Sequence, residues 1–139
     1  MAEQRHLNTK EDYHVHCNYN DHSAPDLTVQ NVVKRAEEIG LQTLAITEHV
    51  RRSSEWVPRY LKELEEIKSQ VRIIPGFEAK ILRDGSIDCP PEHRDRYFII
   101  ASFHTVYGDK QVWMNALKTA IKDQSVDVIG HIALNLAFR

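Results

Sequence analysis

The sequence has 139 residues, which is enough for one globular domain with an apolar core. Hydrophobic residues make up 42% and charged residues 27%, so we expect a folded chain rather than a disordered one. The formal net charge of -2 gives no overall positive field, which disfavours a nucleic-acid-binding module. The sequence shows neither an apolar run of about 18 residues nor a secretory signal. We therefore expect a cytoplasmic protein with no membrane association.

The predicted elements alternate between short strands and helices. A strand at residues 13–15 precedes a helix at 29–39, which Asp26 or Thr28 could cap and which Gly40 ends. A strand at 41–47 and a helix at 57–70 follow, and then a strand at 71–74 that stops at Pro75 and Gly76. A hairpin is predicted at 80–88, a strand at 97–103, a helix at 112–121 and a strand at 126–129. This alternation is typical of βα units around a parallel sheet.

Each predicted strand ends in a side chain that can bind a metal ion. The segments are DYHVH, ITEH, PGFE, ASFH and VIGH, and they carry His14, His16, His49, Glu78, His104 and His131. Because the carboxyl ends of parallel strands lie on one face, these side chains should converge. His14 and His16 are two residues apart and so point to one face of a strand, and His22 on the next loop can bend back toward them.

Histidines with a carboxylate favour zinc, manganese or iron, and the two oxygens of Glu78 could bridge two ions. Two metals about 4 Å apart generate hydroxide from bound water near neutral pH and stabilise the oxygens of a displacement at phosphorus. Cys17 and Cys89 belong to no CxxC pair, so we predict two free thiols and no structural zinc site. The pattern therefore predicts phosphoester hydrolysis.

The motifs DYHVH, AITEH, GFE, SFH and GH resemble, in order and spacing, those of the polymerase and histidinol phosphatase (PHP) family. The resemblance covers nearly the whole chain and implies an α/β fold, a distorted (β/α)7 barrel of which about five of seven βα units are present. It places metal ligands at His14, His16, His22, His49, Glu78, His104 and His131. It implies that His14, His16 and Glu78 hold one metal, that Glu78, His104 and His131 hold a second, and that His22 and His49 hold a third.

Three departures from the family pattern affect these expectations. The family's TDH motif here reads Thr47-Glu48-His49, which keeps a carboxylate on a longer side chain. We expect Glu48 to contact the ligand residues and not a metal ion. Ile132 stands where the family has proline after the last histidine. The closing Asp-x-His motif and the last two strands have no counterpart, so we interpret residues 1–139 as a single PHP domain truncated at its carboxyl end.

Several polar residues near these motifs have open roles. Asp12 could orient a ligand histidine or lie on the surface, and Asp21 is an alternative ligand to His22. Cations that could grip a substrate phosphate are Arg51, Arg52, Arg59 and Lys80, although such charges most often only solvate loops. His6 and His93 are interpreted as ordinary loop residues, and Trp56 and Trp113 as packing residues.

The leading functional prediction is a metal-dependent phosphoesterase of the histidinol-phosphatase kind. It would hydrolyse a small phosphate monoester with metal-bound hydroxide, two or three divalent ions as cofactors, and Glu78 and His104 as catalytic residues. One alternative is a PHP domain with nucleic-acid phosphodiesterase or exonuclease activity, which the near-neutral charge disfavours. Another is a non-catalytic remnant that binds metal. The substrate, the metal and the oligomeric state cannot be read from the sequence.

Overall fold

The computed structural model describes residues 7–133, in which strands and helices alternate as predicted. The elements are β1 (Glu11–Val15), α1 (Val29–Glu38), β2 (Thr43–Val50), α2 (Val57–Glu66), β3 (Arg72–Lys80), β4 (Phe98–Ser102), α3 (Lys110–Lys122) and β5 (Val128–Ile129). A short 3-10 helix, Pro91–His93, lies in the loop before β4. All eight predicted strands and helices are therefore confirmed in type and order, with differences at their ends.

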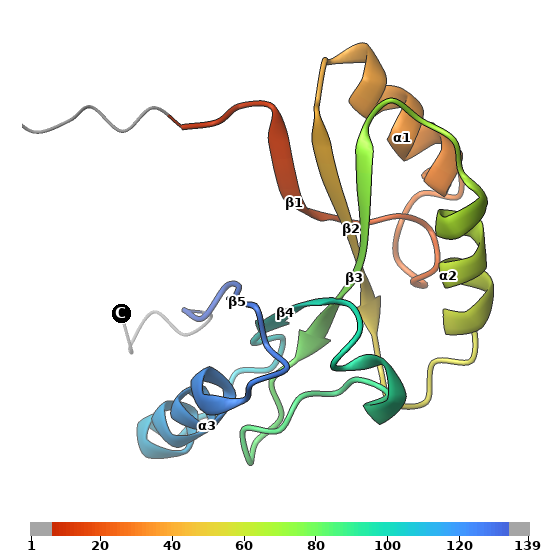
Figure 1. Ribbon diagram of the computed structural model, residues 1–139. Helices are drawn as coiled ribbons and strands as arrows, with labels where there is room; N and C mark the ends of the chain where they lie inside the picture. The colour runs from red at the N-terminus through yellow and green to blue at the C-terminus, as the bar shows by residue number, and fades with distance from the viewer. Residues whose placement is uncertain (1–6, 134–139) are drawn as a thin grey trace, which may run out of the picture.

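The five strands form one parallel sheet in the order β1-β2-β3-β4-β5. Each strand pairs with its neighbours in the chain, and the sheet curls into a half-barrel (Figure 1). This sequential order is the one a βα barrel requires, because every crossover adds the next strand to the same growing edge. The predicted α/β fold is confirmed, and the five parallel strands with three α-helices in residues 7–133 are consistent with part of a PHP-type barrel.

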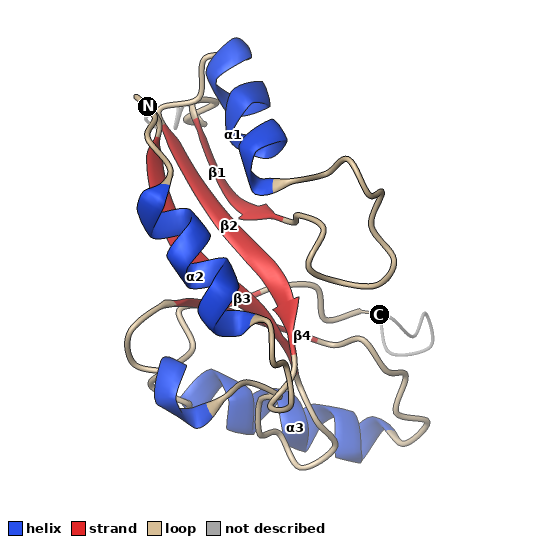
Figure 2. Cartoon of the chain, turned by 90° about the vertical axis from the view of Figure 1, so that its right-hand side faces the viewer, coloured by secondary structure: helices blue, strands red, loops and turns tan. Residues whose placement is uncertain are grey.

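Two helices cover one face of β1–β3 (Figure 2). Helix α1 buries Val29, Val32, Val33 and Ala36, which recur at helical spacing and so form one apolar face. The Thr28 side chain caps the helix by accepting from the amide of Asn31 at 3.1 Å, which settles the choice between Asp26 and Thr28. Gly40, at φ 78°, follows the end of the helix, as predicted.

Tyr60 joins helix α2 to the sheet. Its side chain is fully buried, and its hydroxyl lies 2.7 Å from the carbonyl oxygen of Ile46 and 2.9 Å from that of Gly76. The helix ends at Glu66 and not at residue 70 as predicted, because Ile67 adopts an extended backbone that leads the chain back toward β3. Ile67 still packs against the core, which explains why the apolar spacing overextended the prediction.

Strand β3 is longer than predicted and runs through Pro75 to Lys80. The proline is tolerated because β4 pairs with β3 only from Gly76 onward, so at Pro75 the strand has β2 as its one neighbour in the described chain. The predicted strand end at Pro75 is therefore wrong. The consequence is that Glu78 lies within β3, directly opposite His49 of β2, rather than on a loop.

The segment after β3 forms the predicted tight hairpin, with Gly85 at φ 85° and a single bridge between Ile81 and Ile87. Helix α3 lies beside β4 and β5 (Figure 1) and is capped by the Asp109 side chain. Trp56 and Trp113 are partly buried against the core, which confirms their predicted packing role. Across residues 7–133, no helix combines the length and apolar character needed to cross a membrane.

Candidate metal centre

The side chain of Glu78 is the centre of the histidine cluster. It is buried, with the residue 2% exposed, and both carboxylate oxygens face imidazole nitrogens. Oε1 lies 3.0 Å from His49 Nδ1, 2.9 Å from His104 Nε2 and 3.8 Å from His16 Nε2. Oε2 contacts His14 Nε2 closely and lies 3.6 Å from His131 Nε2. One carboxylate therefore joins five of the six histidines predicted as ligands.

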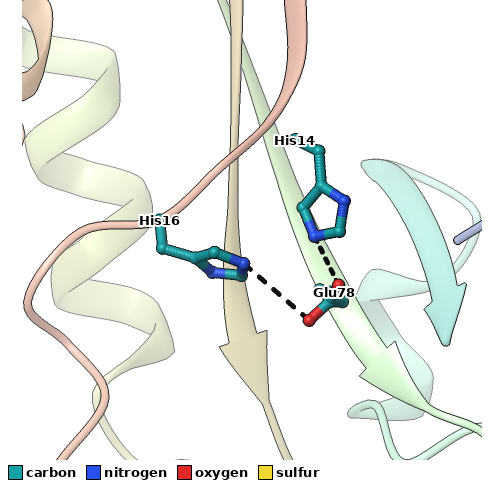
Figure 3. A group of neighbouring side chains, drawn as sticks. All are labelled: His14, His16 and Glu78. Carbon is teal, nitrogen blue, oxygen red and sulfur yellow. Dashed lines mark ion pairs between the residues drawn. The ribbon is translucent and has the colours of Figure 1, made fainter. Parts of the chain in front are cut away.

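Two overlapping groups of side chains could each hold a metal ion. The first is His14, His16 and Glu78 (Figure 3), which is the set the family resemblance gives to the first metal. The second is His49, Glu78 and His104. In each group the possible ligand atoms lie within 4.8 Å of one another, and Glu78 belongs to both. This sharing is the geometry expected of a bridging carboxylate.

The register of the sheet explains why these side chains meet. His49 pairs with Glu78 across β2 and β3, and Glu78 pairs with Ile100 of β4. His14 lies in β1 and His16 directly after it, while His104 and His131 each follow the end of β4 or β5 by two residues. All lie toward the carboxyl ends of parallel strands, so they share one rim of the half-barrel.

The donor set fits divalent zinc, manganese or iron better than calcium, because it combines imidazole nitrogens with one carboxylate. Burial raises the pKa of Glu78, but hydrogen bonds from His104 and His49 and the charge of His14 outweigh it and hold the pKa well below the usual range. Burial also lowers the pKa of His131. An ionised carboxylate and neutral imidazoles are the forms that bind metal.

Strand β5 places His131 through an unusually close approach to β4. The amide of Gly130 donates to the carbonyl of Ala101 at 2.8 Å, and the amide of Phe103 donates to the carbonyl of His131 at 3.0 Å. A Cβ on Gly130 would stand 2.0 Å from Ser102 Oγ. The Ser102 hydroxyl in turn donates to Glu78 Oε2 at 3.3 Å. Glycine at position 130 is therefore required for the contact that brings His131 to the cluster.

Glu48 lies behind the cluster and is fully buried. Its Oε1 is 3.3 Å from His16 Nδ1, and it accepts from Asn20 Nδ2 at 2.8 Å and from the amide of His49 at 2.9 Å. Its Oε2 accepts from the Cys17 thiol at 3.1 Å and from the amide of Tyr19 at 2.9 Å. Burial raises the pKa of Glu48, but hydrogen bonds from His16, Asn20 and Cys17 bring it down to about 2.

Three other residues considered in the sequence analysis, His22, Asp12 and His93, contact groups other than Glu78. His22 is exposed and 3.2 Å from Asp21, with its ring centroid 5.0 Å from that of His49. Asp12 accepts from the backbone amide of His14 at 3.2 Å and not from an imidazole. His93 packs against Phe77 and Tyr97, away from the cluster, and His6 lies outside the described residues.

An open cleft of about 520 Å³ leads to the cluster, and its lining includes His22, His49, Glu78 and His104. Arg51 and Lys80 also line it, whereas Arg52 and Arg59 do not. The Arg52 guanidinium lies 3.4 Å from both Ser86 Oγ and the carbonyl of Ile87, and that of Arg59 lies over the Tyr19 ring. Only two of the four predicted phosphate-binding cations are therefore brought to the cleft.

Sequence reasoning missed Asn20 and Ser102, and it did not connect Cys17 to the site. Ser102 is two residues before His104, so strand periodicity could have placed both on one face. Asn20 lies in a loop, and no spacing rule identifies it. Cys17 and Cys89 are both free and buried, as predicted, and burial together with the charge of Glu48 raises the pKa of the Cys17 thiol.

Comparison with known proteins agrees with the motif analysis. A sequence model of the PHP domain matches residues 12–139. A protein of Acetivibrio thermocellus named "Probable phosphatase" is 30% identical over 129 residues, which is 86% of this chain and 53% of that protein. A "Probable phosphatase" of Shewanella sediminis is 32% identical over 129 residues, 86% of this chain and 52% of that protein.

A third relative is named for a different activity. The "DNA polymerase/3'-5' exonuclease PolX" of Bacillus subtilis is 27% identical over 134 residues, which is 88% of this chain and 23% of that protein. The chain spans about half the length of the phosphatase relatives that it matches.

Proposed function

The chain belongs to the PHP domain family, and on that premise we propose that it is the metal-binding part of a hydrolase that cleaves phosphoric esters. The substrate we propose is a small phosphate monoester, and the active protein is proposed to hold two or three divalent ions of zinc, manganese or iron. The names of two relatives as probable phosphatases support this choice.

The observation that carries the proposal is the position of Glu78. A buried carboxylate that belongs to both groups of possible ligands, and whose two oxygens both face imidazoles, is suited to joining two metal ions, and it lines an open cleft. The ions, when bound, would activate water and stabilise charge on the phosphate oxygens. Glu78 would hold the ions at a fixed separation, and His104, which also lines the cleft, would act as a ligand next to the substrate.

Lys80 and Arg51 are proposed to bind the substrate phosphate. Lys80 lies two residues beyond Glu78 on β3, so its side chain leaves the same face of the strand. Within residues 7–133, neither side chain forms a salt bridge, although the charge of Arg51 also acts on Asp21, so an anion in the cleft would not have to break an ion pair. Lys80→Gln should raise KM for a phosphomonoester more than it lowers kcat, and Lys118→Gln on α3 is the matched charge control.

The first experiment compares hydrolysis of a generic small phosphomonoester by the chain before chelation, after chelation, and after return of zinc or manganese. Activity should disappear with the metal and return with it, and Glu78→Ala should lower the rate by orders of magnitude. An unchanged rate in Glu78→Ala would refute the role of Glu78. Metal content near zero in the purified chain, with no binding of added zinc, would instead favour a non-catalytic protein.

The second candidate function is hydrolysis of phosphodiesters in nucleic acid. The similarity to the polymerase/exonuclease of Bacillus subtilis favours it, whereas the net charge of -2 disfavours a long nucleic-acid contact. Rates on single-stranded DNA and on a phosphomonoester, measured with the same metal-loaded sample, separate the two. A higher kcat/KM on DNA would replace the monoester proposal.

A further inference from the structure

We propose that Glu48 is a positioning residue that sets the orientation of the metal ligand His16 and of the loop that carries His22. This inference rests on the metal-binding part of the proposed function and adds a residue that would act through the ligands without touching substrate. It is drawn from five contacts of one buried carboxylate, whose contacting atoms come from two segments: residues 16–20, which follow β1, and β2 itself.

Four of the five groups around Glu48 are donors, namely the Cys17 thiol, the Asn20 amide group and the backbone amides of Tyr19 and His49, and the fifth is a ring nitrogen of His16. An ionised carboxylate only accepts hydrogen bonds, so His16 Nδ1, 3.3 Å from Oε1, must carry the ring proton. In the neutral ring, which is the form that binds metal, the lone pair of His16 is then on Nε2, the nitrogen that points toward Glu78 (Figure 3). Holding one ring nitrogen with a carboxylate so that the other can bind metal is how ligand histidines are oriented in metal sites generally.

The carboxylate of Glu48 also holds His49 through its backbone amide, and it holds the loop of His22 through Asn20. It accepts from the amide of His49, and the His16 and His49 rings stack with centroids 4.0 Å apart. Asn20 donates to Glu48 while its own Oδ1 accepts from the amides of His22 and Ser23 at 3.1 and 2.8 Å. The loop between β1 and α1 is therefore tied to β2 at the level of the metal cluster.

The length of the side chain matters to this arrangement. Glu48 spans from the His16 ring on one side to the Cys17 thiol and Tyr19 amide on the other. An aspartate at this position has one methylene fewer and cannot keep all five contacts without movement of the strand. Glu48→Asp should therefore loosen His16, even though the carboxylate charge is kept.

The test does not depend on activity. In the metal-free wild-type chain with 15N-labelled histidine, NMR should show His16 as a single tautomer protonated on Nδ1, and a mixture of tautomers would overturn the inference. Glu48→Gln puts an amide group among donors, so the His16 tautomer should become mixed and zinc affinity should fall by about 10- to 100-fold. The matched control is Glu65→Gln, an exposed residue on α2, which should change neither.

Two outcomes distinguish a positioning role of Glu48 from a role in folding alone. If Glu48→Gln does not fold, the tautomer of the wild-type ring still decides the matter. If Glu48→Gln folds and keeps wild-type zinc affinity, the positioning role is wrong, while the phosphoesterase proposal stands. Loss of hydrolysis on chelation is measured separately and tests only the proposed function.

Discussion

Gly130→Ala should disturb the site through the sheet rather than through a ligand. The new Cβ would stand 2.0 Å from Ser102 Oγ and 2.9 Å from Ile100 Cγ2, where ordinary contact begins near 3.4 Å. The Ser102 hydroxyl could rotate away only by giving up its hydrogen bond to Glu78, and Ile100 is a buried core residue. We therefore expect β5 to move outward, at a cost of about 1–3 kcal/mol in the free energy of unfolding.

This movement should also weaken metal binding. The carbonyl of His131 accepts from the Phe103 amide at 3.0 Å, so a displaced β5 takes His131 away from Glu78. The assays are urea unfolding of the metal-free chain and zinc titration against a chromophoric chelator. Gly108→Ala is the control, because a Cβ there meets nothing within 4 Å.

A double variant tests the cause of the effect. Ser102→Ala removes the atom closest to the new Cβ, so Ser102→Ala with Gly130→Ala should be less destabilised than the sum of the two single variants. The close approach of β5 to β4 would be refuted as the reason for glycine if Gly130→Ala matched Gly108→Ala in both stability and zinc affinity.

Three further outcomes are expected. Glu78→Gln should keep the fold but lose most zinc binding, since the ligand shared by both groups is gone, and equilibrium dialysis showing undiminished zinc would contradict the bridging role. Tyr60→Phe should lower stability by about 1–3 kcal/mol, because the one buried hydroxyl that lies between two carbonyls is lost, yet it should leave zinc affinity unchanged. A changed zinc affinity would contradict this expectation. The pKa of Glu48 in the folded chain is about 2 against an ordinary value of 4.5, so its contribution to stability is present above pH 4.5 and is lost as the pH falls toward 2. The free energies of unfolding of wild type and Glu48→Gln should therefore converge as the pH falls from 4.5 to 2. A constant difference between them down to pH 2 would contradict the lowered pKa of Glu48.

The sequence alone determined the alternation of elements and the residues at the strand ends. Helix α1 followed from apolar spacing, from a cap signal at Asp26 or Thr28 and from the stop signal at Gly40, which are local interactions. His14, His49, Glu78, His104 and His131 followed from the rule that parallel strands end on one face. These features are readable because each depends on near neighbours in the chain or on the symmetry of the βα unit.

Only the tertiary structure decided where β3 ends and how the ligands are supported. Local signals end the strand at Pro75, but pairing with β2 carries it on to Lys80 and places Glu78 opposite His49. The same applies to Glu48, whose partners Cys17, Tyr19 and Asn20 lie about 30 residues away in sequence and meet it only because β1 pairs with β2. A sequence can thus reveal which groups could bind metal, whereas the contacts that orient them depend on packing between distant segments, which no local pattern records.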